Sequence, residues 1–251
     1  MSGTVRLRRI TEAVRDAGSI GVAELAELTG ASEMTIRRDL EALAAQGVLE
    51  RYRGGARSLL LRGEEPPFAL RAQEGLEAKR RIAAEVAGLI ADGESVVLDG
   101  GTTCLEVARA LAPRRLTVMP LSLHAVNALT DGPQLTLLVP GGRPRPGELA
   151  LTGPLTEASL AALRFDTAVL GCCGLTAEDG LTAYDLDDAA VKRTAIGCAR
   201  RVIAVAEAGK LSRTALAHVA PVDALHAVVT DAEPDDRTER LAAAGVTVRT
   251  V

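Results

Sequence analysis

Apolar residues at the start of the chain recur at helical spacing in short segments separated by turn residues. Arg6, Ile10 and Val14 fall on one face of a first predicted helix, and a second short helix covers residues 22–28. Each of these segments ends at a turn that contains glycine, which is a common way for a helix to stop. The pattern predicts two short helices joined by a tight connection.

A third helix is predicted to begin after Ser32 and to run to about residue 46, where a glycine follows. The Ser32 hydroxyl is suited to cap this helix because it can accept a hydrogen bond from a free amide of the first turn. Ile36, Leu40 and Leu43 are spaced i, i+4 and i+7, so we expect them to form the buried stripe.

The opposite face of this third helix carries the candidate chemistry. At about 100° per residue, Met34 and Arg38 point away from the buried stripe, and Arg37 and Thr35 lie on its flanks. Arginine can bind the acceptors of guanine in a bidentate manner or hold a phosphate, as a helix in the major groove of DNA requires. The candidate DNA contacts on this helix are Ser32, Met34, Thr35, Arg37 and Arg38.

The segment after the third helix alternates and contains turn glycines, which predicts a two-stranded wing over residues 48–55. Arg51 and Arg53 are expected on one side of its strand, where they could contact backbone phosphates. Two exposed arginines alone would be an ordinary solvated surface. The succession of short helix, turn, capped helix and basic ribbon instead favours a winged helix-turn-helix.

Residues 58–75 break the pattern, because Pro66 and Pro67 follow a charged stretch and interrupt helix or strand. We take this segment as a linker between a DNA-binding domain (1–57) and a larger domain (76–251).

The larger domain contains apolar runs that alternate with helical segments, which predicts an α/β fold with a mostly parallel sheet covered on both faces. The predicted strands are 95–98, 116–119, 135–139, 167–170, 202–206, 227–229 and 246–248. In such folds ligands bind at the carboxyl ends of the strands, where loops lead into helices.

The loop Asp99-Gly100-Gly101-Thr102-Thr103 follows a predicted strand and opens a helix. Its glycines allow close approach of an anion, its hydroxyls can donate to it, and the helix N-terminus is partly positive. Glycines also follow later strands, at Gly141-Gly142 and at Gly171. Together these residues form a candidate effector site for an anionic metabolite.

Charge and composition sharpen this division. The first 58 residues hold nine arginines, no lysine and eight acids, whereas the rest holds 20 basic and 25 acidic residues. The chain has only three lysines against 26 arginines, and a compact ammonium suits a phosphate or carboxylate in a tight pocket. We therefore add Lys192 and Lys210 to the candidate effector site.

Other classes of protein find little support in the sequence. No apolar run approaches the roughly 18 residues of a membrane span, and no signal peptide precedes the first helix, so a cytoplasmic location is expected. The four cysteines have no zinc-site spacing and are expected to be reduced. No catalytic residue, metal site or cofactor is predicted.

The stretch Ser32 to Leu40, SEMTIRRDL, resembles the signature of the DeoR family of bacterial transcriptional regulators. Residues 49–56, the Asp99–Thr103 loop and the glycines of the larger domain resemble later landmarks of the same family. This resemblance implies a helix-turn-helix at residues 20–39 in which Arg37 and Arg38 contact DNA.

The resemblance also implies a C-terminal sensor similar to ribose 5-phosphate isomerase, with a phosphorylated sugar bound by the Asp99–Thr103 loop near Lys192 and Lys210. The chain departs from the family at Pro120-Leu121, where Thr-Asn is common, and this indicates a different or less polar effector. Two acids also differ from the family in side-chain length. Asp188 stands where Glu is usual, and Glu207 stands where Asp is usual.

The sequence therefore favours a sequence-specific regulator, a repressor of a carbohydrate operon, that binds operator DNA as a homodimer or homotetramer. One arm of this size buries little surface on DNA, so more than one copy is expected. Two alternatives stay open: a sugar-phosphate isomerase that carries a DNA-binding arm, and a DNA-binding protein whose larger domain binds no ligand.

Overall fold

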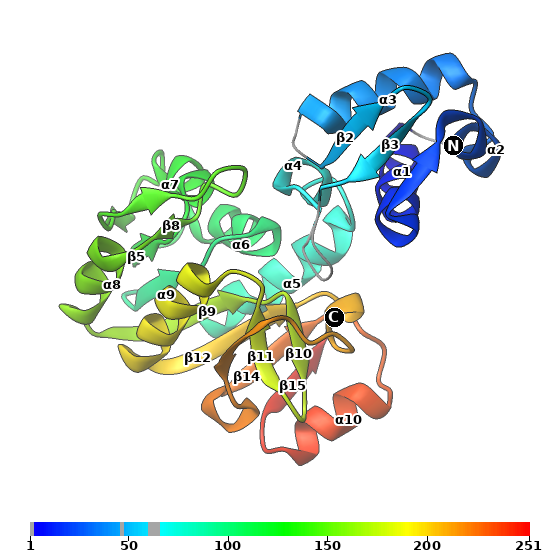
Figure 1. Ribbon diagram of the computed structural model, residues 1–251. Coiled ribbons are helices and arrows are strands. Elements are labelled where there is room, and N and C mark those ends of the chain that lie inside the picture. Colours follow the sequence, from blue (N-terminus) through cyan, green and yellow to red (C-terminus); the bar gives the residue numbers. More distant parts are fainter. Residues whose placement is uncertain (1–2, 46–47, 60–65) are drawn as a thin grey trace. The chain divides into compact units, whose positions relative to one another are not determined.

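The computed structural model describes residues 3–45, 48–59 and 66–251 of the chain (Figure 1). The chain divides into two units, Met1–Glu74 and Gly75–Val251. Each unit has its own hydrophobic core and is described by itself.

The N-terminal unit contains the three predicted helices, and their core is the predicted one. Ile10 and Val14 of the first helix pack with Ile36, Leu40 and Leu43 of the third, and all five are buried. The helices are α1 (Gly3–Ala17), α2 (Val22–Thr29), α3 (Glu33–Ala45) and the short α4 (Phe68–Arg71).

The wing is larger than the predicted ribbon. Strands β2 (Leu49–Tyr52) and β3 (Gly55–Ser58) form the expected antiparallel pair, but β1 (Ser19–Gly21) joins them, so the sheet has three strands in the order β1-β3-β2. The sequence pattern assigned the start of β1 to a turn, because a strand of three residues is too short to show alternation.

The predicted linker is only partly described. Residues 60–65, with their charged run, lie outside the described residues, as does the predicted helix stop at Gly47. Beyond Pro66 and Pro67 the chain forms α4, and Leu70 of this helix packs on the N-terminal core.

The C-terminal unit is built on a parallel sheet of seven strands, and each strand corresponds to one predicted apolar run. The strands are β4 (Ser95–Leu98), β5 (Thr117–Pro120), β6 (Thr136–Leu137), β9 (Phe165–Gly171), β12 (Ala199–Ala206), β14 (Ala227–Thr230) and β15 (Thr247–Thr250).

Helices cover both faces of this sheet, as predicted from its apolar strands (Figure 1). One core contains Val96 and Leu98 together with α5 (Leu76–Leu89), α6 (Thr102–Leu111) and α7 (Leu123–Leu129). Val97 points into the other core, with α8 (Pro154–Ala161), α9 (Leu186–Gly197) and α10 (Asp236–Ala243).

Two small antiparallel elements were not predicted. The first is a sheet of β10 (Gly174–Thr176), β11 (Gly180–Ala183) and β13 (Ala217–Ala220), and the second is the hairpin of β7 (Arg143–Pro144) and β8 (Leu151–Thr152). Their strands have two to four residues and several glycines, so they leave no periodic signal in the sequence.

The strand order β15-β14-β12-β9-β4-β5-β6 contains one reversal of direction. From β4 the chain proceeds outward to β5 and β6, and it then returns to place β9 on the other side of β4. A crevice at the carboxyl ends of two strands that diverge in this way is the usual ligand site of an open parallel sheet. The loop after β4 and the glycine that ends β9 meet at this point.

Candidate functional site

The third helix presents the predicted face. Its buried stripe is inside the core, and the Thr35 amide donates to the Ser32 hydroxyl at 3.2 Å, so Ser32 caps the helix as predicted. Met34 is 69% exposed, and Arg37 and Arg38 are both exposed. An exposed methionine beside two guanidinium groups can contact a thymine methyl group and guanine or phosphate acceptors.

The two arginines differ in their partners. Arg37 donates to Glu33 one turn earlier at 2.9 Å, whereas Arg38 has no hydrogen bond or ion pair within the described residues. Arg38 therefore offers a guanidinium that needs no internal contact to be broken before it can bind a partner.

An ion pair that sequence reasoning missed holds this helix in place. Arg6 Nε of α1 lies 2.6 Å from Asp39 Oδ2 of α3, and both side chains are largely buried. The sequence contained a signal for this pair, because Arg6 shares the buried face of its helix with Ile10 and Val14, and Asp39 adjoins the buried stripe of α3.

The wing holds its arginines differently from the prediction. Arg51 lies on β2 and approaches Glu41 of α3 at 3.7 Å. Arg53 was predicted on the same side of the strand, but β2 ends at Tyr52, and Arg53 lies in the turn with Gly54, whose φ is +96°. The prediction was wrong on this point because the hairpin turn falls at Arg53 and Gly54, so the alternation of β2 does not extend to Arg53. Both arginines are exposed.

At the carboxyl edge of the parallel sheet, three predicted effector residues meet. Asp99 Oδ2, directly after β4, accepts hydrogen bonds from the Gly171 amide of β9 at 2.9 Å and from Lys192 Nζ of α9 at 2.5 Å. Lys192 also contacts Asp188 at 3.1 Å. Asp99 and Lys192 are almost completely buried. The carboxylate thus ties together β4, β9 and α9.

Burial and charge set the protonation of this cluster. Burial by itself lowers the pKa of Lys192, but Asp188 and Asp99 outweigh it and raise that pKa above its ordinary value. Burial raises the pKa of Asp99, and Lys192 opposes the rise. The cluster therefore favours the charged form of Lys192, which lies between the carboxyl groups of Asp99 and Asp188.

The rest of the Asp99–Thr103 loop leads directly into the first turn of α6. Gly101 has φ +93° and precedes α6, a conformation that L side chains rarely adopt. A Cβ on Gly100 would lie 3.3 Å from the Cβ of Ala150. Thr102 and Thr103 are buried at the first two helical positions, and their hydroxyls have no hydrogen-bond partner within the described residues. These hydroxyls and the amides at the start of α6 can donate to an anion.

The other predicted effector residues have structural contacts. Lys210 Nζ donates to the carbonyl of Cys172 at 2.7 Å, next to Gly171. Gly141 accepts from the Thr156 hydroxyl of α8 at 2.8 Å, and a Cβ on Gly142 would collide with that hydroxyl. Lys210 thus belongs to the neighbourhood of Asp99, whereas the two glycines pack against α8.

The positions that depart from the family pattern also have structural partners. Leu121 is buried in the core, and its amide donates to Leu98 at 2.7 Å. Glu207 lies 3.5 Å from the fully buried Lys79. Sequence reasoning did not consider Lys79, although it is one of only three lysines.

Two arginines of the β7–β8 hairpin, Arg143 on β7 and Arg145 directly after it, were missed as well. Arg143 reaches Asp187 at 3.2 Å and Arg145 reaches Asp185 at 3.8 Å, both acids lying at the start of α9. Four cations and four carboxylates therefore surround the carboxyl edge: Arg143, Arg145, Lys192 and Lys210, and Asp99, Asp185, Asp187 and Asp188.

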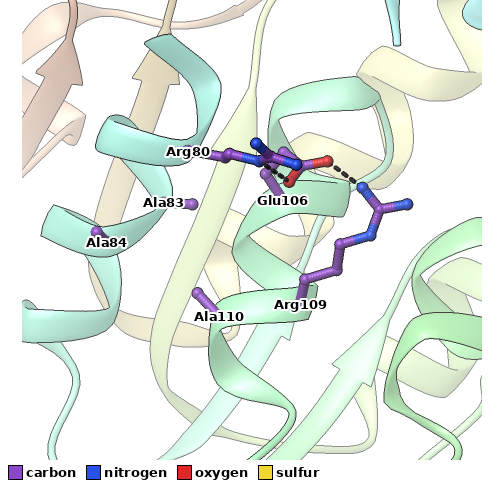
Figure 2. Close-up of a pocket in the computed structure, with 6 residues that line it drawn as sticks. All are labelled: Arg80, Ala83, Ala84, Glu106, Arg109 and Ala110. Atoms are coloured by element: carbon purple, nitrogen blue, oxygen red, sulfur yellow. Dashed lines mark hydrogen bonds and ion pairs between the residues drawn. The ribbon is translucent and has the colours of Figure 1, made fainter. Parts of the chain in front are cut away.

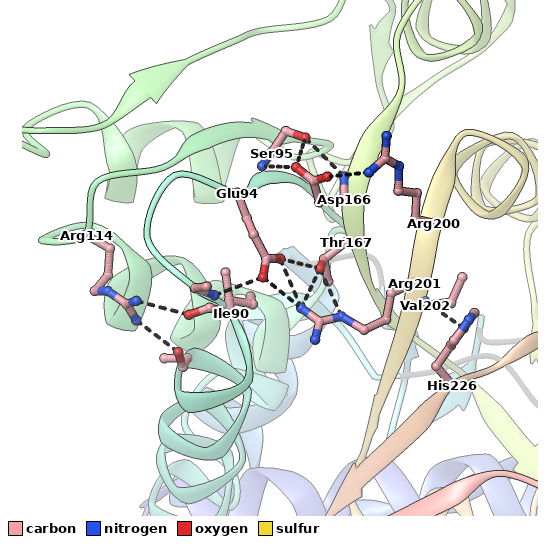
Figure 3. A network of polar contacts seen from close by, with 12 residues as sticks. Ile90, Glu94, Ser95, Arg114, Asp166, Thr167, Arg200, Arg201, Val202 and His226 are labelled. Atoms are coloured by element: carbon pink, nitrogen blue, oxygen red, sulfur yellow. Dashed lines mark hydrogen bonds and ion pairs between the residues drawn. The ribbon is translucent and has the colours of Figure 1, made fainter.

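Other polar groups of the C-terminal unit have structural roles. At the amino ends of the strands, Arg201 pairs with Glu94 at 3.0 Å, and the Ser95 amide and hydroxyl donate to Asp166 (Figure 3). Between α5 and α6 lies an open cleft in which Glu106 is buried beneath Arg80 and Arg109 (Figure 2). The first network joins β4, β9 and β12, and the second joins the two helices.

No group of three or more His, Cys, Asp or Glu side chains is arranged to hold a metal ion in the described ranges. None of the four cysteines, all of which lie in these ranges, forms a disulfide bond. Within the part of the chain that the structure describes, no helix has the length and apolar character needed to cross a bilayer.

Comparison with known families and proteins covers both units. The DeoR-like helix-turn-helix domain matches residues 6–60, and the DeoR C-terminal sensor domain matches residues 74–232. The chain is 34% identical to the HTH-type transcriptional regulator GlpR of Haloferax volcanii, over 97% of this chain and 96% of that protein. It is 32% identical to the glycerol-3-phosphate regulon repressor of Escherichia coli, over 93% of each.

Among solved structures, ribose 5-phosphate isomerase A of Methanocaldococcus jannaschii is similar at a TM-score of 0.41 and 15% identity, over 55% of each chain. This likeness is too distant to carry an argument about function.

Proposed function

Since the chain belongs to the DeoR family of transcriptional regulators, we propose that it represses an operon of carbohydrate metabolism and that a phosphorylated sugar or a related metabolite relieves this repression. The regulator and repressor relatives match nearly its whole length, so the chain is a DNA-binding regulator and not an enzyme.

The observation that carries the proposal is the outer face of α3. Its buried stripe and its Ser32 cap fix the helix, and the exposed side holds Met34, Arg37 and Arg38. In this proposal Arg38 reads base edges or phosphates directly, and Arg37 exchanges Glu33 for DNA. Ser32 and Thr35 contact the DNA backbone near the N-terminus of α3, where the helix dipole favours a phosphate group. Arg51 and Arg53 of the wing hold flanking phosphates.

We assign residues 1–57 to the DNA-binding domain, with its helix-turn-helix at 20–39, residues 58–75 to the linker and residues 76–251 to the sensor. The division of the structure after Glu74 and the ranges of the two family matches support a boundary between two domains near residue 75, and α4, inside the proposed linker, packs on the N-terminal core. Operator binding by one arm is weak, so a homodimer or homotetramer places two arms on one operator.

The effector site of this proposal lies at the carboxyl ends of β4 and β9. It comprises Asp99, Gly100, Gly101, Thr102, Thr103 and Gly171, together with Lys192, Lys210, Gly141 and Gly142. Two observations support it: the reversal of strand order at this point and the unpartnered hydroxyls at the start of α6. A relative named for the glycerol-3-phosphate regulon makes a phosphorylated compound the first choice. The metabolite acts only if it binds one arrangement of the arms more tightly than the other.

The test is binding of the purified chain to the promoter of its own operon and to a scrambled duplex at rising salt, by fluorescence anisotropy. A repressor of this kind prefers the promoter by a factor of about a thousand or more and loses affinity steeply with salt. A sugar phosphate then releases the promoter. Equal binding to both duplexes contradicts sequence-specific regulation, and retention of the promoter with every sugar phosphate favours a DNA-binding protein whose larger domain senses no ligand.

A further inference from the structure

A buried cationic atom without a partner lies in the hairpin between β7 and β8. The Nε atom of Arg145 is shielded from solvent and has no hydrogen-bond partner within the described residues. Burying an N–H of a guanidinium removes its hydration, and without a replacement acceptor this is costly. Native structures rarely keep such a group unless an ion, a water molecule or a ligand satisfies it.

The remaining end of the same side chain is held loosely. Its Nη1 atom lies 3.8 Å from Asp185 Oδ2, which is close to the limit of an ion pair. The carboxylate of Asp185 is already used, because its Oδ1 accepts the Asp188 amide at 2.8 Å and caps α9. Arg145 therefore has no strong acceptor at either end of its guanidinium.

The hairpin that carries Arg145 adjoins the Asp99–Thr103 loop. The Arg145 amide donates to the Ala150 carbonyl at 2.7 Å, and Ala150 packs so closely on Gly100 that a Cβ there would lie 3.3 Å from it. On the other side, Asp185 caps α9, and Lys192 of that helix donates to Asp99. The hairpin that carries Arg145 and the helix α9, whose cap Asp185 it approaches, thus both contact the Asp99–Thr103 loop.

Among the four cations at this edge, Arg145 has the most to gain from an incoming anion. Lys192 is saturated by two carboxylates, at 2.5 and 3.1 Å, and Lys210 is held by a carbonyl at 2.7 Å. Arg143 is 77% exposed, so water already solvates it. Arg145 combines partial burial with weak partners, and a phosphate beside it would replace lost hydration rather than compete with a tight ion pair.

We propose that Arg145 binds the phosphate group of a phosphorylated effector through Nε and one Nη atom. This inference rests on the proposed function of the C-terminal unit as a sensor, and it names the residue that selects phosphorylated over neutral sugars. The planar fork of an arginine matches two oxygens of a phosphate monoester, which an ammonium such as that of Lys192 cannot do. Lys192 then acts as a positioning residue that holds Asp99.

The test measures binding of glycerol 3-phosphate, ribose 5-phosphate and fructose 6-phosphate to the full chain by calorimetry, each beside its unphosphorylated counterpart. For the phosphorylated compound that binds the unaltered protein, Arg145→Gln is expected to lower the affinity about 10- to 100-fold, because charge-assisted hydrogen bonds are lost. Arg145→Lys keeps the charge without the fork and should be intermediate. The matched control Arg143→Gln, on the same hairpin, should change the affinity less than about twofold.

The melting temperature without ligand provides a second readout. Arg145→Gln removes an unsatisfied buried donor, so the free protein should melt at the same temperature or slightly higher while its response to the ligand is lost. A clear fall in the melting temperature, or unchanged binding in Arg145→Gln, overturns the inference and leaves the regulator proposal intact. An unaltered protein that binds its promoter but none of the phosphorylated compounds overturns this inference together with the effector class, and failure to bind the promoter overturns the proposed function itself.

Discussion

Lys192 and Asp99 lie 93 residues apart in the sequence, and their Nζ and Oδ2 atoms are 2.5 Å apart in a buried cluster. Lys192 also holds Asp188, so one ammonium compensates two carboxylates. The pair joins the helix α9 to the end of β4 at the point where the sheet reverses its strand order. The contact therefore holds α9 against the end of β4, and both of its residues belong to the proposed effector site.

Removing the ammonium should be strongly destabilising. Lys192→Met leaves two buried carboxylates without a cation, and we expect a loss of about 3–5 kcal/mol in the free energy of unfolding, measured with urea. The double variant Asp99→Asn, Lys192→Met should recover part of this loss, because an amide oxygen can still accept the Gly171 amide. A double variant no more stable than the single one would show that the Asp99–Lys192 contact is not what the stability depends on.

A substitution of Gly101, in the loop before α6, should give a regulator that no longer responds to its effector. Gly101 has φ +93°, so Gly101→Ala strains the loop by about 1–3 kcal/mol and moves the amides that would hold the ligand. The matched control is Gly88→Ala in α5, where a Cβ meets nothing within 4 Å and should stabilise the helix by about 0.5–1 kcal/mol. Promoter release by the ligand is the measurement. Normal release in Gly101→Ala would place the effector elsewhere.

The wing arginines should affect affinity without affecting sequence preference. Arg51→Ala and Arg53→Ala remove the proposed phosphate contacts, so each should weaken binding to promoter and scrambled DNA by similar factors and reduce the slope of log K against log salt by about one. Anisotropy titrations at several salt concentrations check this. A selective loss of promoter binding would instead make these arginines base readers.

The Ser95–Asp166 contact at the amino edge predicts a dependence of stability on pH (Figure 3). Hydrogen bonds from the Ser95 amide and hydroxyl lower the pKa of Asp166 below its ordinary value. A carboxylate of this kind stabilises the fold above its unfolded pKa, about 3.9, and the contribution is lost as the pH falls through the lower folded value. The stability difference between the unaltered chain and Asp166→Asn should therefore be full at pH 6 and shrink below about pH 4. A difference that grows on acidification contradicts the assignment.

Much of the fold could be predicted because it depends on local patterns. The stripe Ile36, Leu40 and Leu43 and the Ser32 cap define α3 without reference to the rest of the chain. The inner strands of the parallel sheet are buried and mostly apolar, and short apolar runs also mark the more exposed edge strands β6 and β15, so each of the seven appeared as a separate run. Strand β1 and the strands β10, β11 and β13 were missed, because antiparallel strands of three or four residues owe their existence to a partner elsewhere in the chain.

The candidate sites divide in the same way. Exposure of Arg37 and Arg38 follows from helical geometry, and the meeting of Asp99 and Gly171 follows from the rule for parallel sheets. Which cation is saturated and which is not depends on contacts between distant segments, such as Lys192 with Asp99 or Arg145 with Asp185. No local pattern contains that information, so the lysines were predicted as ligands and Arg145 was not.

The central claim is that the outer face of α3 reads the operator, and the preference of Arg38→Ala for promoter over scrambled DNA tests it most directly. The account predicts that this preference falls by about 5- to 150-fold, corresponding to 1–3 kcal/mol for one lost base contact. Arg9→Ala, which removes an exposed arginine of α1, should lower both affinities and leave the preference unchanged. An Arg38→Ala protein that discriminates as well as the unaltered chain would contradict the account.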